Sequence, residues 1–571
     1  MFGFTFGTAG WPDGIAPLGR DPNRVQLELD GLSMNDMFTG RPRFDLLPVA
    51  WLFSLSSSSS LGYVAQFDSL LSKQPMTFVR YESSGSSAQA VGVLHVQNRI
   101  ISQSSSPKRL QTAFGYSGEG GRGEYDGSSL KRARVVSARI GIRSETWSIE
   151  LSEFAQRRSV GAQAGVIPFN GADYSSIYQR LGATVEDETA RRRSLRNDLV
   201  LRLSTTISGL EARFSGIWTR ETLDFSNESI QEKGVMDRIG GVAEFQKQLA
   251  KSKASIRLSL NQEALNRGSV FSEGRSTSRA FYSAKGGIEG TFRVLSYFGS
   301  LGFEGSTGTS WSTIDAGAVV KEGPFSINLA LHRAGRALTW HELNGFGQTI
   351  SRSPFDVQPI EQFVSATLGW KSGLFSIDWT GMLSLDRELL VTQKTTDATK
   401  AAVEWMPGSS SSSVSSFVFG FRTNAESGIW AEVNPVVRST RTDDASSLAA
   451  AWRASLPSAW ATATLGWKAL LFNDDLDLKV YARARFWDEM GGLRLHTPTG
   501  LLVLPLDTSE RVESNWLVDF VAEGGIRGAT LFLSYENAFS GTTALFGNLI
   551  IPDYPLPQQR TRFGVYWPIL N

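Results

Sequence analysis

Hydrophobic and polar side chains alternate one by one over many short stretches of this chain. In segment 476–487 one face carries Leu476, Leu478, Val480, Ala482, Ala484 and Phe486, and the other carries Asp477, Lys479, Tyr481, Arg483, Arg485 and Trp487. Because successive side chains of a strand point to opposite faces, this period of two predicts a β-strand with one apolar and one polar face. The same alternation occurs in segments 134–143, 147–152, 199–203, 210–218, 256–260, 325–332 and 461–471.

The joins between the predicted strands are alternately short and long. Short joins are expected near Ser144 and at 206–209, 250–253, 322–324, 372–373, 473–475 and 525–527, and long ones at 155–197, 220–237, 263–279, 334–361, 488–514 and 539–560. The serine-rich segment Gly408 to Ser416 is also expected to be a turn. From about residue 110 onward we count about 22 strands.

Short turns on one side and long loops on the other are typical of bacterial outer-membrane barrels. We therefore predict an all-β fold, a transmembrane antiparallel β-barrel over residues 105–571, with both chain ends on the side of the short turns. The alternative is a soluble all-β protein. A propeller would repeat every 40 to 50 residues or so, and the chain has no such repeat.

Residues 1–104 differ from the rest of the chain. Gly, Pro and Ser are frequent, and two serine-rich tracts occur at 56–60 and 83–87. This segment has too few long apolar strands to build its own core. A barrel of about 22 strands encloses a lumen too wide for its own side chains to fill. We therefore predict that residues 1–104 form a plug domain in the lumen, with Asp30-Gly31 at a turn.

Motifs at both ends of the chain resemble those of TonB-dependent outer-membrane receptors. The plug motif of that family, N-R-V-x-V-x-L-D-G-x-P-x-N-D, is matched by Asn23, Arg24, Val25, Leu29, Asp30, Gly31, Asn35 and Asp36. Segment 90–97, which contains Gly92, resembles the family's plug-closing sequence G-G-V-I-N-I-x-T. Segments 534–539 and 552–565 are similar to the last two strands of the family's barrel.

This resemblance implies a 22-stranded barrel with a plug in the bacterial outer membrane, surrounded by lipid and lipopolysaccharide. It also implies uptake of a scarce small-molecule ligand, of the siderophore, cobalamin or oligomer type, with a periplasmic TonB-type energy-coupling protein as partner. The alternative is a passive outer-membrane channel, or a structural barrel, with a degenerate plug. Neither a TonB box nor a secretory signal is visible before the plug motif, so the chain is expected to start inside a longer precursor or at a misassigned start.

Composition narrows the chemistry that the chain can perform. Lys+Arg 57 and Asp+Glu 56 nearly cancel, so no net charge favours nucleic acid as a partner. No segment approaches the roughly 18 apolar residues that a membrane-spanning helix needs. The chain has no cysteine, and its four histidines are not spaced as metal ligands. We therefore expect no metal, no cofactor and no catalytic residues, which argues against an enzyme.

One basic run, Arg191, Arg192, Arg193 and Arg196, stands out from the predicted strands. The simpler interpretation is a solvated face at the base of a long loop. The functional interpretation is contact with an anionic ligand or with the phosphates of lipopolysaccharide, because guanidinium groups bind phosphate in a bidentate manner.

Overall fold

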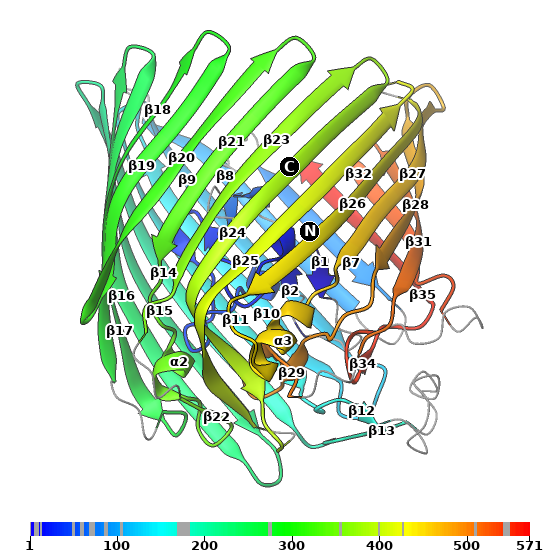
Figure 1. Cartoon of the computed structure of the whole chain (residues 1–571). Helices are drawn as coiled ribbons and strands as arrows, with labels where there is room; N and C mark the ends of the chain where they lie inside the picture. The colour runs from blue at the N-terminus through cyan, green and yellow to red at the C-terminus, as the bar shows by residue number, and fades with distance from the viewer. Residues whose placement is uncertain are drawn as a thin grey trace.

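The computed structural model is a closed antiparallel β-barrel with a small plug inside its lumen (Figure 1). The structure describes residues 2–4, 11, 14–47, 52–57, 62–67, 75–84, 89–102, 107–167, 183–271, 277–352, 357–397, 400–424, 427–506, 511–540 and 549–570.

The barrel has 22 strands, which confirms the predicted total, although two of them, β7 and β8, precede residue 110, where the count in the sequence began. They are β7 (Met76–Ser83), β8 (Gln89–Ser102), β9 (Lys108–Gly121), β10 (Leu130–Arg143), β11 (Trp147–Gly161), β14 (Arg191–Ile207), β15 (Leu210–Ser226), β16 (Gln231–Leu249), β17 (Ser252–Gly268), β18 (Ser278–Phe292), β19 (Leu295–Ser306), β20 (Thr309–Glu322), β21 (Phe325–Gly335), β23 (Ile360–Ser372), β24 (Phe375–Lys394), β25 (Ala401–Arg422), β26 (Gly428–Thr442), β27 (Ala459–Leu471), β28 (Leu476–Trp487), β31 (Asn515–Ile526), β32 (Ala529–Glu536) and β35 (Arg560–Leu570). The last strand closes the barrel by pairing with the first, Leu570 opposite Met76.

The two rims of the barrel differ in the way the sequence predicts. Short hairpins form the upper rim in Figure 1, and the longer loops gather at the lower rim. The loops hold α2 (Trp340–Asn344), α3 (Ser447–Ala454), β12 (Val166–Ile167), β13 (Thr184–Val185), β22 (Ile350–Ser351), β29 (Arg494–His496), β30 (Leu501–Val503), β33 (Leu549–Ile551) and β34 (Tyr554–Pro555). We call the rim with the short hairpins the short-turn rim and the rim with the longer loops the loop rim.

The two faces of β28 are as the alternation predicts. Val480 and Phe486 point outward and are exposed, whereas Arg483 points into the lumen, where its guanidinium lies 3.0 Å from Asp519. Large apolar side chains cover the exterior of most other strands in the same way, and such a surface is suited to lipid. No helix in the described ranges is long and apolar enough to span a membrane.

The boundary between plug and barrel lies earlier than the predicted division at residues 104 and 105. The strands β7 and β8 belong to the barrel, which therefore begins at Met76. Segment 90–97, with Gly92, is part of β8 and does not close the plug. The physical reason is its two-faced pattern: Val91 and Val93 are exposed on the outside, while Leu94 and Val96 are buried against the plug.

The predicted turn at Gly408–Ser416 is wrong, because this segment lies inside β25. It pairs with β24 on one side and with β26 on the other. Its hydroxyl groups bond to neighbouring strands, as Ser412 does with Thr440 at 2.8 Å. Serine is therefore compatible with a strand here because its polar group has partners across the sheet.

The plug consists of a small mixed sheet and a hairpin. The sheet has the order β4 (Leu32–Ser33), β3 (Leu27–Leu29), β6 (Tyr63–Phe67), β5 (Leu52–Ser57), and the hairpin pairs β1 (Phe2–Phe4) with β2 (Gly14–Ala16). Single 3₁₀ turns lie at Pro17–Gly19 and Phe44–Leu46.

The hairpin of β1 and β2 lies in the lumen next to the loop rim, where Phe2 packs edge-on against Trp460. The expectation that both chain ends lie at the short-turn rim is therefore confirmed for the end of β35 and wrong for β1. The apolar side chains Phe2 and Trp11 find a buried site among the loops instead.

Candidate functional site: the interface between plug and barrel

The plug motif builds a tight turn and a braced loop. Asp30 and Gly31 both have positive φ (48° and 82°), the geometry of the two-residue hairpin turn that joins β3 to β4. After β4, the amide of Asn35 donates to the carbonyls of Val25 and Gly40 and accepts from the backbone N–H of Leu27. Asn35 thus fixes the loop that follows it, which carries Asp36.

Asp36 is the acidic centre of this loop and is almost fully buried. One carboxylate oxygen accepts from the backbone N–H groups of Phe38 and Thr39, both at 3.0 Å. The other oxygen lies 3.4 Å from Arg43 of the plug and 3.2 Å from Arg192 of the barrel strand β14. The plug loop and the barrel wall therefore share one carboxylate.

Arg43 and Asp45 extend this contact. Arg43 holds Asp45 by two hydrogen bonds of 2.9 Å and also donates to Ser194 of β14. Burial alone would raise the pKa of Asp45, but the charges of Arg43 and Arg158 outweigh it and hold that pKa well below its usual range. Burial would lower the pKa of Arg43, but the carboxylates of Asp45 and Asp36 raise it. Both groups are therefore charged at neutral pH.

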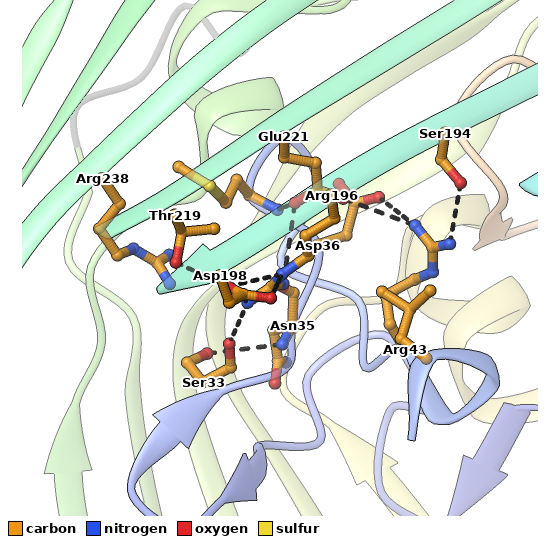
Figure 2. Close-up of polar contacts among 12 residues, drawn as sticks. Ser33, Asn35, Asp36, Arg43, Ser194, Arg196, Asp198, Thr219, Glu221 and Arg238 are labelled. Atoms are coloured by element: carbon orange, nitrogen blue, oxygen red, sulfur yellow. Dashed lines mark hydrogen bonds and ion pairs between the residues drawn. The ribbon is translucent and has the colours of Figure 1, made fainter. Parts of the chain in front are cut away.

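The barrel contributes its own charges from neighbouring strands (Figure 2). Arg196 binds Asp198 through two nitrogens and donates to the plug carbonyls of Asn35 and Ser33 at 3.0 and 2.6 Å. Glu221 of β15 accepts from the backbone N–H of Met37 and lies 3.5 Å from Arg43. We call these residues the ionic cluster: Asp36, Arg43, Asp45, Arg192, Arg196, Asp198 and Glu221.

The remaining residues of the plug motif also contact the barrel. The Asn23 amide pairs with the backbone of Leu502 in an outer loop, donating at 2.6 Å and accepting at 3.0 Å. Arg24 bonds to the Leu390 carbonyl on β24. Arg202 of β14 donates to the Asp30 carbonyl at 3.1 Å. The structure thus places every motif residue except Gly92 in the plug.

The basic run divides between the two faces of β14. Arg192 and Arg196 point inward and are buried in the ionic cluster, so they are not the solvated face that the simpler interpretation predicts. Arg193 points outward with a side chain 57% exposed, and Arg191 donates to Ser129 at 2.8 Å. Contact of this run with an anionic ligand stays a prediction.

Sequence reasoning did not single out Arg43, Asp198 and Glu221, and it matched Asp45 only to the aspartate of a second plug segment of the family. Arg196-x-Asp198 is one available signal, because residues two apart share a strand face, and an inward pair must be satisfied in the lumen. The partners that bridge plug and barrel are more than 100 residues apart, and no local pattern reports such contacts.

The tip of the plug loop lies in an apolar pocket formed by loops of the loop rim. Phe38 is fully buried, stacks on Phe271 and meets Phe346 edge-on, with ring centroids 6.0 and 6.5 Å away. Its carbonyl accepts from the backbone N–H of His341 in α2 at 3.1 Å. The plug is thus joined to the loops as well as to the wall.

The opposite flank of the plug is open. A cavity of about 740 Å³ lies between the plug and the wall, lined by β17 to β21 and continuing to residues of β23 to β26 and of the loops. The wall is polar there: Lys285 pairs with Glu304 at 2.6 Å, and Asp315 with His332 at 2.6 Å. The plug therefore leaves space beside β17 to β21, while Arg20 and Arg24 bond it to Glu361 of β23 and to Leu390 of β24 beyond this space.

Taken together, these features define a class: a large β-barrel with an apolar exterior, whose lumen holds a plug with mixed polar and apolar contacts. No family model matches the chain, and no curated protein matches it in sequence. Solved structures do match in fold. The chain is similar to the FrpB iron transporter from Neisseria meningitidis (TM-score 0.71, 13% identity, covering 99% of this chain and 94% of that one).

The chain is also similar to the siderophore receptor PirA from Acinetobacter baumannii (TM-score 0.70, 10% identity, 99% and 94% covered). A third match is the copper transporter OprC (TM-score 0.73, 9% identity, 100% and 93% covered). At such identities the likeness concerns the fold: this chain has the plug-and-barrel fold of TonB-dependent receptors.

Proposed function

We propose that this protein is an outer-membrane receptor that takes up a scarce small-molecule ligand, with its plug displaced when a TonB-type periplasmic protein pulls on it. The observation that carries the proposal is the uneven packing around the plug, which is bonded to β14 and also to β23 and β24, and faces a cavity along β17 to β21. Apolar side chains and the ionic cluster attach it to the wall around β14, while the cavity along β17 to β21 leaves space into which it can shift. The similar structures, named as iron, siderophore and copper proteins, support uptake of a chelated or bare metal ion.

The same cavity favours a second candidate, a passive channel with a degenerate plug. A polar flank beside the plug could pass small solutes without any movement of the plug. The two candidates differ in what closes the pore, so conductance separates them.

The test compares single-channel conductance of the full chain with that of a chain lacking residues 1–74, both in planar bilayers. The receptor function predicts little conductance for the full chain and a large open pore after the deletion. Equal conductance in both would replace the receptor by the passive channel. The deletion stops before Met76, so every barrel strand remains.

Energy coupling needs a separate experiment in cells. Uptake of ferric enterobactin, a ferric trihydroxamate and Cu²⁺ is measured in cells that export the chain, with and without a functional TonB-type protein. We expect uptake of at least one probe to require that protein. Uptake that is the same in both strains would contradict active transport.

A further inference from the structure

Three arginines lie on the outer surface of the barrel, on adjacent strands, where the apolar band ends. Arg134 on β10 is paired in register with Arg157 on β11, and Arg157 is paired with Leu195 on β14. Arg193, two residues from Leu195 on the same outward face, completes the group. We call these three residues the outer arginine patch.

The position of the patch relative to the membrane follows from its strand neighbours. Towards the short-turn rim, the outward face of these strands first carries the polar pair Glu153 on β11 and Asn197 on β14. Its large outward residues are otherwise apolar, namely Val136 and Ile140 on β10, Ile149 and Leu151 on β11, and Leu199, Leu201 and Leu203 on β14. Towards the loop rim the strands end within a few residues. The guanidinium groups therefore stand at the boundary between the apolar band and water, on the outer side.

In the outer arginine patch, the positive charges outnumber the carboxylates close to them. Like charges directly opposite each other on neighbouring strands are destabilising, and such side chains start only about 5 Å apart at Cβ. Among the described residues, no carboxylate lies within 4.0 Å of Arg134 or Arg157, and Arg193 has a loose partner, Asp224 at 3.8 Å. The neighbour of Arg134 on β9 is Gly118, over which the ring of Tyr116 lies, so this side brings no carboxylate.

The geometry points to a binding site for the phosphorylated headgroup of lipopolysaccharide in the outer leaflet. Paired guanidinium groups match phosphate oxygens in a bidentate manner, and a bound phosphate removes the repulsion between Arg134 and Arg157. The apolar side chains next to the patch lie where the acyl chains of the same lipid would run. The inference rests on the proposed outer-membrane location but not on transport.

The test measures binding of lipid A to the full chain in phosphatidylcholine nanodiscs by native mass spectrometry. The probes are bis-phosphorylated lipid A and the same lipid after removal of its phosphates. We expect the parent to prefer the phosphorylated form and R134Q/R157Q to lose about tenfold in affinity for it. A parent that binds both lipids equally would overturn the proposal.

A matched control removes two exposed arginines at the short-turn rim, R213Q/R527Q, with the same loss of charge. An equal loss of affinity in this control would show that lipid A binding depends on net charge alone, which would overturn the proposed site. Displacement of lipid A by millimolar inorganic phosphate would make free phosphate, not the lipid, the ligand. If R134Q/R157Q does not insert, R157Q alone is measured, with a several-fold loss expected and no loss counting against the site. A transport failure in cells leaves these outcomes unchanged.

Discussion

Asp36 is the residue at which the plug loop, Arg43 and the barrel wall meet. Asp36 is 2% exposed and its carboxylate faces two guanidinium groups, so water cannot take the place of this carboxylate in compensating their charge. Removing one partner of a buried ionic pair leaves the other charge uncompensated, which is far more costly than loss of an exposed pair.

Asp36→Asn should therefore weaken docking of the plug by about 3 kcal/mol. The measurement is the urea concentration at which the full chain begins to conduct in a planar bilayer, and we expect a clear decrease. Glu489→Gln is the control, because its partner Arg511 is exposed, and its effect should stay below about 1 kcal/mol. Equal midpoints for Asp36→Asn and the parent would show that the ionic cluster does not hold the plug.

His341 makes the contact between α2 and the plug sensitive to acid. Burial lowers the pKa of His341 to about 4, with the nearby Glu342 opposing and Arg336 adding to this shift. An exposed histidine titrates near 6.5 or so, so the opened loop takes up a proton that the closed loop rejects. The closed form is therefore fully favoured above pH 6.5 and loses stability as the pH falls towards 4.

Hydrogen exchange of segment 336–352, corrected for the intrinsic pH dependence of exchange, measures this effect. Loop opening should increase by up to about tenfold from pH 6 to pH 5. His341→Gln should abolish this dependence. Retention of the full pH dependence in the variant would assign the effect to another group.

Outward and inward residues alternate along individual strands, so the same substitution can be compared on the lipid face and on the lumen face. Ala482 is outward on β28, paired with Leu465 and Phe520, both exposed to the exterior. Ala330 on β21 is on the inward face, between the exposed Leu329 and Leu331. The same change therefore meets lipid at one position and the lumen at the other.

Ala482→Arg should destabilise the folded barrel by roughly 2 to 4 kcal/mol, and Ala330→Arg by much less. Folding into lipid vesicles, followed by reversible denaturation in guanidinium chloride, measures both. Equal stability of Ala482→Arg and the parent would mean that the facing of β28 is reversed. Equal loss in both variants would mean that side-chain volume, and not lipid, causes the effect.

At the scale of the whole molecule, the plug rests on β14 and β15 and leaves a cavity beside β17 to β21. Thr219 on β15 is fully buried beside the ionic cluster, and its hydroxyl donates to Asp198 at 2.7 Å. Ser283 on β18 lines the cavity. The chain has no cysteine, so introduced thiols report each wall without background.

A water-soluble maleimide should label Ser283→Cys in the intact protein, while Thr219→Cys should stay protected. After deletion of residues 1–74, both positions should react. Protection of Ser283→Cys in the intact protein would show that the cavity is closed to solvent. Labelling of Thr219→Cys before the deletion would show that the plug does not rest on β15.

The sequence alone determined the barrel, because the period of two is local: each strand must present apolar side chains to lipid and polar ones to the lumen over its own length. Asp30-Gly31 likewise marked a turn, because positive φ favours those residue types, and the resemblance of the surrounding motif to a known family marked the plug. Local patterns failed at β7 and β8, whose two-faced pattern was attributed to the plug, and at β25, where serine hydroxyls bond across the sheet.

Only the tertiary structure decided which charges meet. Arg192 and Arg193 are adjacent in sequence, yet one is buried against Asp36 and the other faces outward beside Asp224. The bond between Asp36 and Arg192 spans 156 residues, and its strength comes from burial that neither segment has alone. Closure of the barrel around the plug creates both the low dielectric and the contact, so the attachment of the plug is a property of the folded molecule.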